Sequence, residues 1–111
     1  HYKNKVGFHQ DDFGGSASCP RIHVCTSLTN STNNLFQVIS GTHKMGSFKH
    51  TMFAPYLRIQ KKELEPVKSK TVDISLEKQD ILIFSTTLIH RLKENNTEQS
   101  KWIGRFIFNV N

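Results

Sequence analysis

The stretch Asp80-Ile81-Leu82-Ile83-Phe84-Ser85 places four consecutive apolar residues between polar ones, and it decides the fold class. A short apolar run of this kind is typical of a β-strand that is buried on both faces. Similar runs of β-branched and aromatic residues recur along the chain, with turn-forming residues between them, which is the pattern of a β-sandwich or barrel. We therefore expect strands near residues 2–9, 20–28, 35–40, 51–59, 71–76, 80–85, 87–93 and 102–110.

Helix is almost absent from this pattern. Residues 61–64 could form a single turn before Pro66, whose ring and missing N–H end a helix. Eight strands in 111 residues are enough for a double-stranded β-helix, the jelly-roll arrangement of two facing sheets. The sequence contains no internal repeat, low-complexity tract or linker. It therefore predicts a single all-β domain over residues 1–111.

The charge of the chain limits its possible partners. Fifteen Lys and Arg against nine Asp and Glu give a net charge of +6, which is compatible with an anionic ligand. The lysines are mixed with acidic residues, and no dense basic tract with interleaved aromatics is present, which argues against a nucleic-acid partner. No apolar run approaches the roughly 18 residues of a membrane span. Without a visible signal or transmembrane segment, we expect a cytoplasmic protein; the sequence does not indicate its oligomeric state.

The two cysteines, Cys19 and Cys25, do not form a CxxC pair, which argues against a structural zinc site. We expect both to be free thiols.

The residues that suggest a metal site are His9-Gln10-Asp11 near one end of the chain and His90 and Arg105 near the other. If residues 9–11 are extended, His9 and Asp11 point to the same side, because side chains alternate along a strand. His90 would add a second imidazole from a distant strand. Two imidazoles and one carboxylate are the set that holds non-haem Fe(II) on one face and leaves the other positions open. Arg105 would then offer a planar fork to the carboxylate of a bound acid.

Neighbouring residues compete for these roles. Asp12 adjoins Asp11 and Arg91 adjoins His90, but alternation turns both away from the predicted site. In the glycine-flanked turn, His43 is expected to be a hydrogen-bonded structural residue, although it could approach a substrate. We expect His23 and His50 to be ordinary strand or surface residues.

The order of these motifs resembles the phytanoyl-CoA dioxygenase family. The resemblance rests on His9-Gln10-Asp11, then on the segment from Asn33 to Lys44 that ends in Gly41-Thr42-His43-Lys44, then on 80–84 leading to His90 and Arg105. The family pattern is similar to HxD, N-G-x-L-x-x-x-P-G-S-H-K, G-D-x-x-x-F, a histidine and an arginine. The chain departs from it at Asn34 and Gln79, where glycine is usual, at Ser40 for proline and Thr42 for serine, and in a longer interval between His90 and Arg105. These departures fall in turns and put loop geometry in question.

The resemblance implies an Fe(II)- and 2-oxoglutarate-dependent dioxygenase that hydroxylates a small molecule with O₂ and releases succinate and CO₂. It implies that His9, Asp11 and His90 are the catalytic iron ligands and that Arg105 binds the C5 carboxylate of 2-oxoglutarate. The helical N-terminal portion of the family is not expected within these residues.

Two alternatives remain open from the sequence. Oxidative demethylases of modified nucleobases share the HxD, H, R order and would suit the basic charge. They place a second arginine six residues after the first, where this chain has Asn111. A non-catalytic jelly-roll binding domain is the other alternative, since this architecture hosts many functions. The segment 44–70 would form the variable pocket wall, and its mixture of lysines and apolar residues does not specify the substrate.

Overall fold

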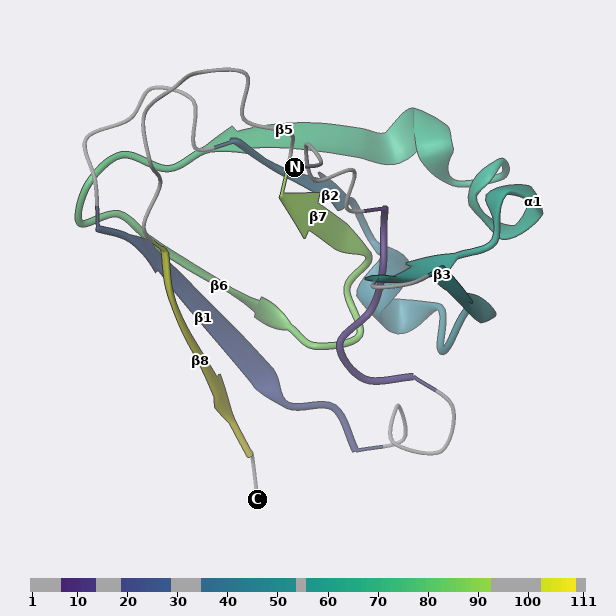
Figure 1. Cartoon of the computed structure of the whole chain (residues 1–111), viewed down its shortest axis with the longest axis horizontal. Coiled ribbons are helices and arrows are strands. Elements are labelled where there is room, and N and C mark those ends of the chain that lie inside the picture. The colour runs from purple at the N-terminus through teal and green to yellow at the C-terminus, as the bar shows by residue number, and fades with distance from the viewer. Residues whose placement is uncertain (1–6, 14–18, 29–34, 54–55, 93–102, 110–111) are drawn as a thin grey trace.

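The chain folds into antiparallel β-sheets with little helix, in a computed structural model that describes residues 7–13, 19–28, 35–53, 56–92 and 103–109 (Figure 1). The strands are β1 (Ile22–Ser27), β2 (Leu35–Ile39), β3 (His50–Phe53), β4 (Tyr56–Ile59), β5 (Thr71–Ser75), β6 (Ile81–Ser85), β7 (His90–Leu92) and β8 (Ile103–Phe108). One α-helical turn, α1 (Lys61–Leu64), confirms the expected turn before Pro66, and 3₁₀ turns occupy Thr42–Lys44 and Lys68–Lys70.

Two three-stranded sheets carry most of the structure, with strand orders β6-β1-β8 and β5-β2-β7. Their inner faces contribute to one core cluster, which joins Cys25 and Phe84 of the first sheet to Phe36 of the second. This arrangement confirms the predicted all-β, jelly-roll-like fold, and the described strands do not close into a barrel. None of the described helices is long and apolar enough to cross a membrane.

A second core cluster fixes the segment that precedes β1. Phe8 packs with Ile39, Ile59, Val67 and Ile89, so it joins the end of β2 to the β3-β4 hairpin and to the turn before β7. Because Phe8 is buried in this cluster, the next residues along the chain are held beside β7.

Two of the predicted strands differ from those observed. The strand expected at 51–59 is a hairpin, in which β3 and β4 pair antiparallel with His50 opposite Ile59. The sequence has Pro55 between them, and a proline lacks the N–H that a central strand position needs. Of the strand expected at 2–9, residues 2–6 lie outside the described residues, and His9 forms only an isolated antiparallel bridge with His90.

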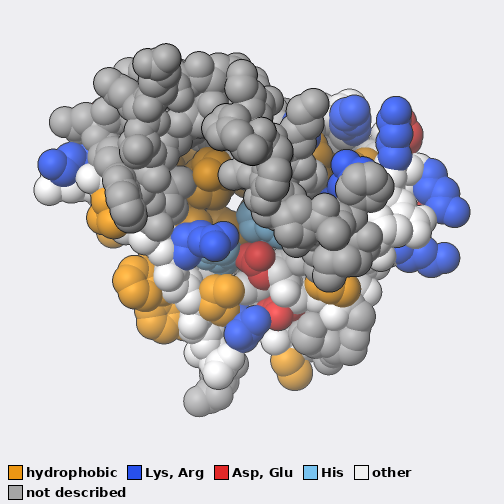
Figure 2. All heavy atoms as spheres, viewed as in Figure 1, with side chains coloured by type: hydrophobic (Ala, Val, Ile, Leu, Met, Phe, Trp, Pro, Cys, Tyr) orange, Lys and Arg blue, Asp and Glu red, His pale blue; other side chains and the backbone are white. Residues whose placement is uncertain are grey.

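The expectation that β6 is buried on both faces is wrong. Phe84 is buried, whereas Ile81 and Ile83 are 64% and 63% exposed. The outer face of this sheet also exposes Phe106 and Phe108 of β8, and Figure 2 shows hydrophobic side chains gathered over this part of the molecule. The inner face packs against the second sheet, while the described residues leave the outer face uncovered.

Candidate metal centre

The His-x-Asp segment is held by backbone hydrogen bonds to the connection between β6 and β7. His9 and His90 exchange two bonds, each with an N···O distance of 3.0 Å. The amides of Asp11 and Asp12 both donate to the carbonyl of Thr86, at 2.9 and 3.1 Å. Since the segment bends after His9 and does not continue as a strand, these bonds set the position of Asp11.

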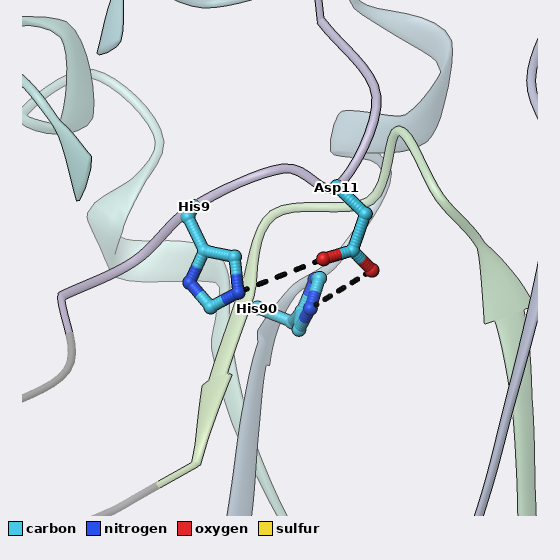
Figure 3. A group of neighbouring side chains, drawn as sticks. All are labelled: His9, Asp11 and His90. Atoms are coloured by element: carbon cyan, nitrogen blue, oxygen red, sulfur yellow. Dashed lines mark ion pairs between the residues drawn. The ribbon is translucent and has the colours of Figure 1, made fainter. Parts of the chain in front are cut away.

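The structure brings His9, Asp11 and His90 together (Figure 3). One ligand atom from each lies within 4.8 Å of the others. The Nε2 atom of His9 is 3.8 Å from Asp11 Oδ1, and that of His90 is 3.4 Å from Asp11 Oδ2. His90 is buried, and His9 and Asp11 are half-buried. In Figure 2 histidine and acidic side chains meet near the centre of the displayed face.

Both imidazoles are oriented through their other ring nitrogen. Nδ1 of His9 lies 3.0 Å from the carbonyl oxygen of Gly7, and Nδ1 of His90 lies 2.8 Å from that of Leu88. A carbonyl only accepts, so each Nδ1 carries the proton and the neutral ring has its lone pair on Nε2. A second hydrogen bond of this kind is the usual way in which a metal-binding histidine is fixed.

The protonation states also suit a cation. Burial and the neighbouring His90 lower the pKa of His9 to about 4, so this imidazole is neutral near pH 7. Burial by itself would raise the pKa of Asp11, but the hydrogen bond from His23 and the proximity of the His90 ring outweigh it and hold that pKa well below its usual range. The cluster therefore offers a neutral imidazole and an ionised carboxylate, the forms that bind a metal.

Asp12 turns away from the cluster, as expected. Its carboxylate accepts two hydrogen bonds from the Arg21 guanidinium, at 3.0 and 2.9 Å, and one from the Thr86 hydroxyl at 2.5 Å. The hydrogen bond from Arg21 holds the pKa of Asp12 below its ordinary value.

Arg105 lies on the inner face of the first sheet. It stands opposite Cys25 in the β1–β8 register, and cross-strand partners share a face. Burial raises the pKa of the Cys25 thiol to about 11; Arg105 lowers that pKa slightly, and Asp11 raises it slightly. Arg105 is itself an exposed residue of β8. Arg91 points elsewhere, because its Nε donates to Gln37 at 2.6 Å and its guanidinium covers the Phe8 ring at 4.1 Å.

Sequence reasoning missed two residues at the centre. His23, expected to be ordinary, is 2% exposed, and its Nδ1 lies 2.5 Å from Asp11 Oδ2. Gln10 is 1% exposed, and its amide bonds three backbone groups of neighbouring loops. Alternation with buried Cys25 could have indicated that His23 faces inward, but nothing in the sequence indicated which carboxylate it meets.

Two further histidines of the described part of the chain, His43 and His50, are not in the cluster. His43 is exposed, contrary to the expected structural role. The hydroxyl of its neighbour Thr42 secures the turn instead, donating to Ile39 and accepting from the Ile89 amide. His50 is half-buried and structural, since its Nε2 accepts the backbone N–H of Gln10 at 2.9 Å.

A cavity of about 440 Å³ is lined by residues of β2, β5 and β6 and of the turns after β2 and β6, and none of the three proposed ligands is among them. Its walls include Val38, the strand partner of His90, and Phe84, whose ring centroid is 4.7 Å from that of His90. Leu88 and His43 also line it.

Comparison with known proteins gives one match. The model of the phytanoyl-CoA dioxygenase family matches residues 1–103, which include His9, Asp11 and His90 and stop two positions before Arg105. No curated protein and no solved structure matches the chain.

Proposed function

The chain belongs to the phytanoyl-CoA dioxygenase family, a family of iron-dependent dioxygenases, and on that premise we propose that it is an Fe(II)- and 2-oxoglutarate-dependent dioxygenase that hydroxylates a small molecule. The observation that carries the proposal is the convergence of His9, Asp11 and His90 within 4.8 Å. These residues come from two segments that lie about 80 positions apart in the sequence, and a shared site accounts for their meeting.

The donor set fits the metal. Two Nε2 atoms, each on a ring whose Nδ1 is hydrogen-bonded to a carbonyl, stand beside an ionised carboxylate. His9, Asp11 and His90 would hold Fe(II) and leave its remaining positions to the co-substrate and dioxygen. Bound iron supplies the activation of dioxygen that couples decarboxylation of 2-oxoglutarate to succinate and CO₂ with hydroxylation of the substrate.

The residues of the chain would bind the metal and the co-substrate and would orient them. Asp11 would place a negative charge against the cation, and each histidine would present an Nε2 lone pair, because its Nδ1–H is donated to a carbonyl. Arg105, on the face of the first sheet that carries Cys25, would offer a planar fork for the far carboxylate of 2-oxoglutarate. The apolar side chains of Val38 and Phe84, which adjoin His90, would exclude water from a small substrate held there.

Anaerobic titration tests the proposal directly. Fe(II) and 2-oxoglutarate together should give the visible absorption of their chelate, which neither gives alone. The variants His9→Ala and Asp11→Ala should lose it, because each removes a proposed ligand. Arg105→Ala should keep the absorption but need roughly 10- to 100-fold more 2-oxoglutarate, since a charge-assisted pair is worth about 1.5–3 kcal/mol.

Turnover is then measured as succinate released from 2-oxoglutarate in the presence of candidate substrates. Failure of the folded wild-type protein to bind Fe(II) would overturn the proposal. An absorption that persists in Asp11→Ala would show that the metal binds elsewhere.

A further inference from the structure

His23 is a third imidazole at the centre, and it contacts the carboxylate of Asp11. Its ring is enclosed between Phe84, at a centroid distance of 4.6 Å, and His90, whose ring it meets edge-on at 5.6 Å. With 2% of its surface exposed, the ring has little freedom to turn. The position of its two nitrogens is therefore fixed by packing against both neighbours.

The two nitrogens of His23 have different surroundings. Nδ1 lies 2.5 Å from Asp11 Oδ2, and because a carboxylate only accepts, this nitrogen donates. Nε2 is buried and has no hydrogen-bond partner among the described residues. Leaving a buried acceptor unpaired costs free energy, so packing alone does not account for a histidine at this position. The hydrogen bond from Nδ1 to Asp11 does account for it.

Asp11 needs an external restraint. It lies in a bend, not in a strand, so regular secondary structure does not fix its side chain. Its oxygens lie 3.8 and 3.4 Å from the two ligand imidazoles, distances at which orientation decides whether three atoms can meet one cation. The contact with His23 is shorter than either.

We propose that His23 is a positioning residue that holds the Asp11 carboxylate, through its Nδ1–H, in the orientation that binds the metal with His9 and His90. This inference rests on the proposed metal centre. Residues that hydrogen-bond a metal ligand typically change metal affinity by 10- to 100-fold when they are removed. His23 would thus act on affinity without being a ligand itself.

Replacing His23 by an amide or an aliphatic residue distinguishes the roles of its two ring nitrogens. In His23→Asn the side-chain amide nitrogen takes the place of Nδ1, whereas in His23→Gln it reaches the place of Nε2. His23→Leu keeps the branching and removes both. Exposed His43→Asn is the matched control for the loss of a histidine that is not part of the His9–Asp11–His90 cluster.

The experiment titrates each metal-free protein with Co(II) and records the dissociation constant and the visible spectrum of bound Co(II). Thermal melting of the metal-free variants verifies that they fold. We expect a dissociation constant raised about 10- to 100-fold in His23→Leu and His23→Gln, and a value within about threefold of wild type in His23→Asn and His43→Asn. The wild-type spectrum should be retained in His23→Asn. Should His23→Leu not fold, the comparison of His23→Asn with His23→Gln decides.

Two results would overturn the positioning role. One is an unchanged affinity in a folded His23→Leu variant. The other is a spectrum in His23→Asn that shows the loss of a nitrogen ligand, because His23 would then bind the metal directly. Failure of the proposed function looks different: the wild-type protein itself would not bind Co(II), or His9→Ala would bind it as well as the wild type.

Discussion

Gln10 is not a proposed metal ligand, but its side chain holds together the loops that surround the centre. Its amide nitrogen donates to the carbonyls of Gly46 and Thr87 at 2.9 and 2.7 Å, and its amide oxygen accepts from the Phe48 N–H at 2.9 Å. Gln10→Glu should destabilise the metal-free protein by about 3 kcal/mol, because a buried carboxylate cannot donate to two carbonyls. Urea denaturation measures the loss, and the same change at exposed Gln79 should have little effect. A stability equal to wild type would show that these loops do not depend on Gln10.

Gln79 has a backbone conformation that glycine adopts more readily. Its φ is 75°, the one positive value found among the non-glycine residues that the structure describes. It is also the position at which the family pattern has glycine. Gln79→Gly should therefore raise the free energy of unfolding by about 1 kcal/mol, since the left-handed conformation costs an ordinary residue about 1–2 kcal/mol and glycine loses part of that gain as chain entropy. Thermal denaturation measures the change, and Lys78→Gly, at a position with an ordinary φ, should lower stability instead.

Individual site residues could be predicted to the extent that their roles depend on order and spacing. His9, Asp11 and His90 were named from the sequence, and the structure brings them together. His23 and Gln10 were missed because their roles depend on which groups face them from other strands and loops. The sequence predicts His9 and Asp11 on one side of an extended strand. In the structure, a bend that is hydrogen-bonded to Thr86 places Asp11 beside His9 instead.

At the scale of elements, three segments are joined at the turn that follows the His-x-Asp motif. Asp12 binds Arg21 just before β1 and Thr86 just after β6, and Arg21 and Thr86 bond each other through their backbones. Asp12→Asn should lower the free energy of unfolding, because the buried Asp12 side chain loses its charge-assisted hydrogen bonds, while the more exposed Arg21 keeps its contact with water. Arg21→Lys should lower the free energy of unfolding by less, because lysine keeps the positive charge and loses only the paired N–H donors of the guanidinium. Calorimetry of the metal-free variants ranks them, and the reverse order would contradict this account.

Two of the strand predictions show where the local sequence pattern is not enough to predict the structure. The run at 81–84 correctly predicted a strand, but the exposure of Ile81 and Ile83 depends on what covers the outer face of the sheet, which is a non-local property. The hairpin of β3 and β4 was predicted as one strand because both halves are rich in strand-forming residues. The sequence has Pro55 between the two halves, and a proline argues against a continuous strand.

For the molecule as a whole, Cys25 reports whether the two sheets stay together. It is fully buried in the cluster between them, whereas Cys19 is exposed, and both are free. A thiol reagent at pH 8 should modify one cysteine quickly and the second only at the rate of unfolding. Because burial raises the pKa of Cys25 to about 11, the folded state binds more protons above pH 9, so stability should fall as pH rises from 9 to 11. Rapid modification of both thiols in the native protein would contradict a closed core.

The metal centre should act on the stability of the whole fold, because its proposed ligands come from opposite ends of the described chain. His9 and Asp11 precede β1 and His90 begins β7, and these segments are assembled only in the native state. A cation that binds the native state alone adds about 2.7 kcal/mol at 100 times its dissociation constant. For a domain of about this size we expect Tm to rise by roughly 10 °C, with the rise reversed by a chelator. His90→Ala should melt at the same temperature with and without Co(II), while exposed His43→Asn should retain the full shift. An equal shift in His90→Ala would mean that the cation stabilises the protein from a site other than this one.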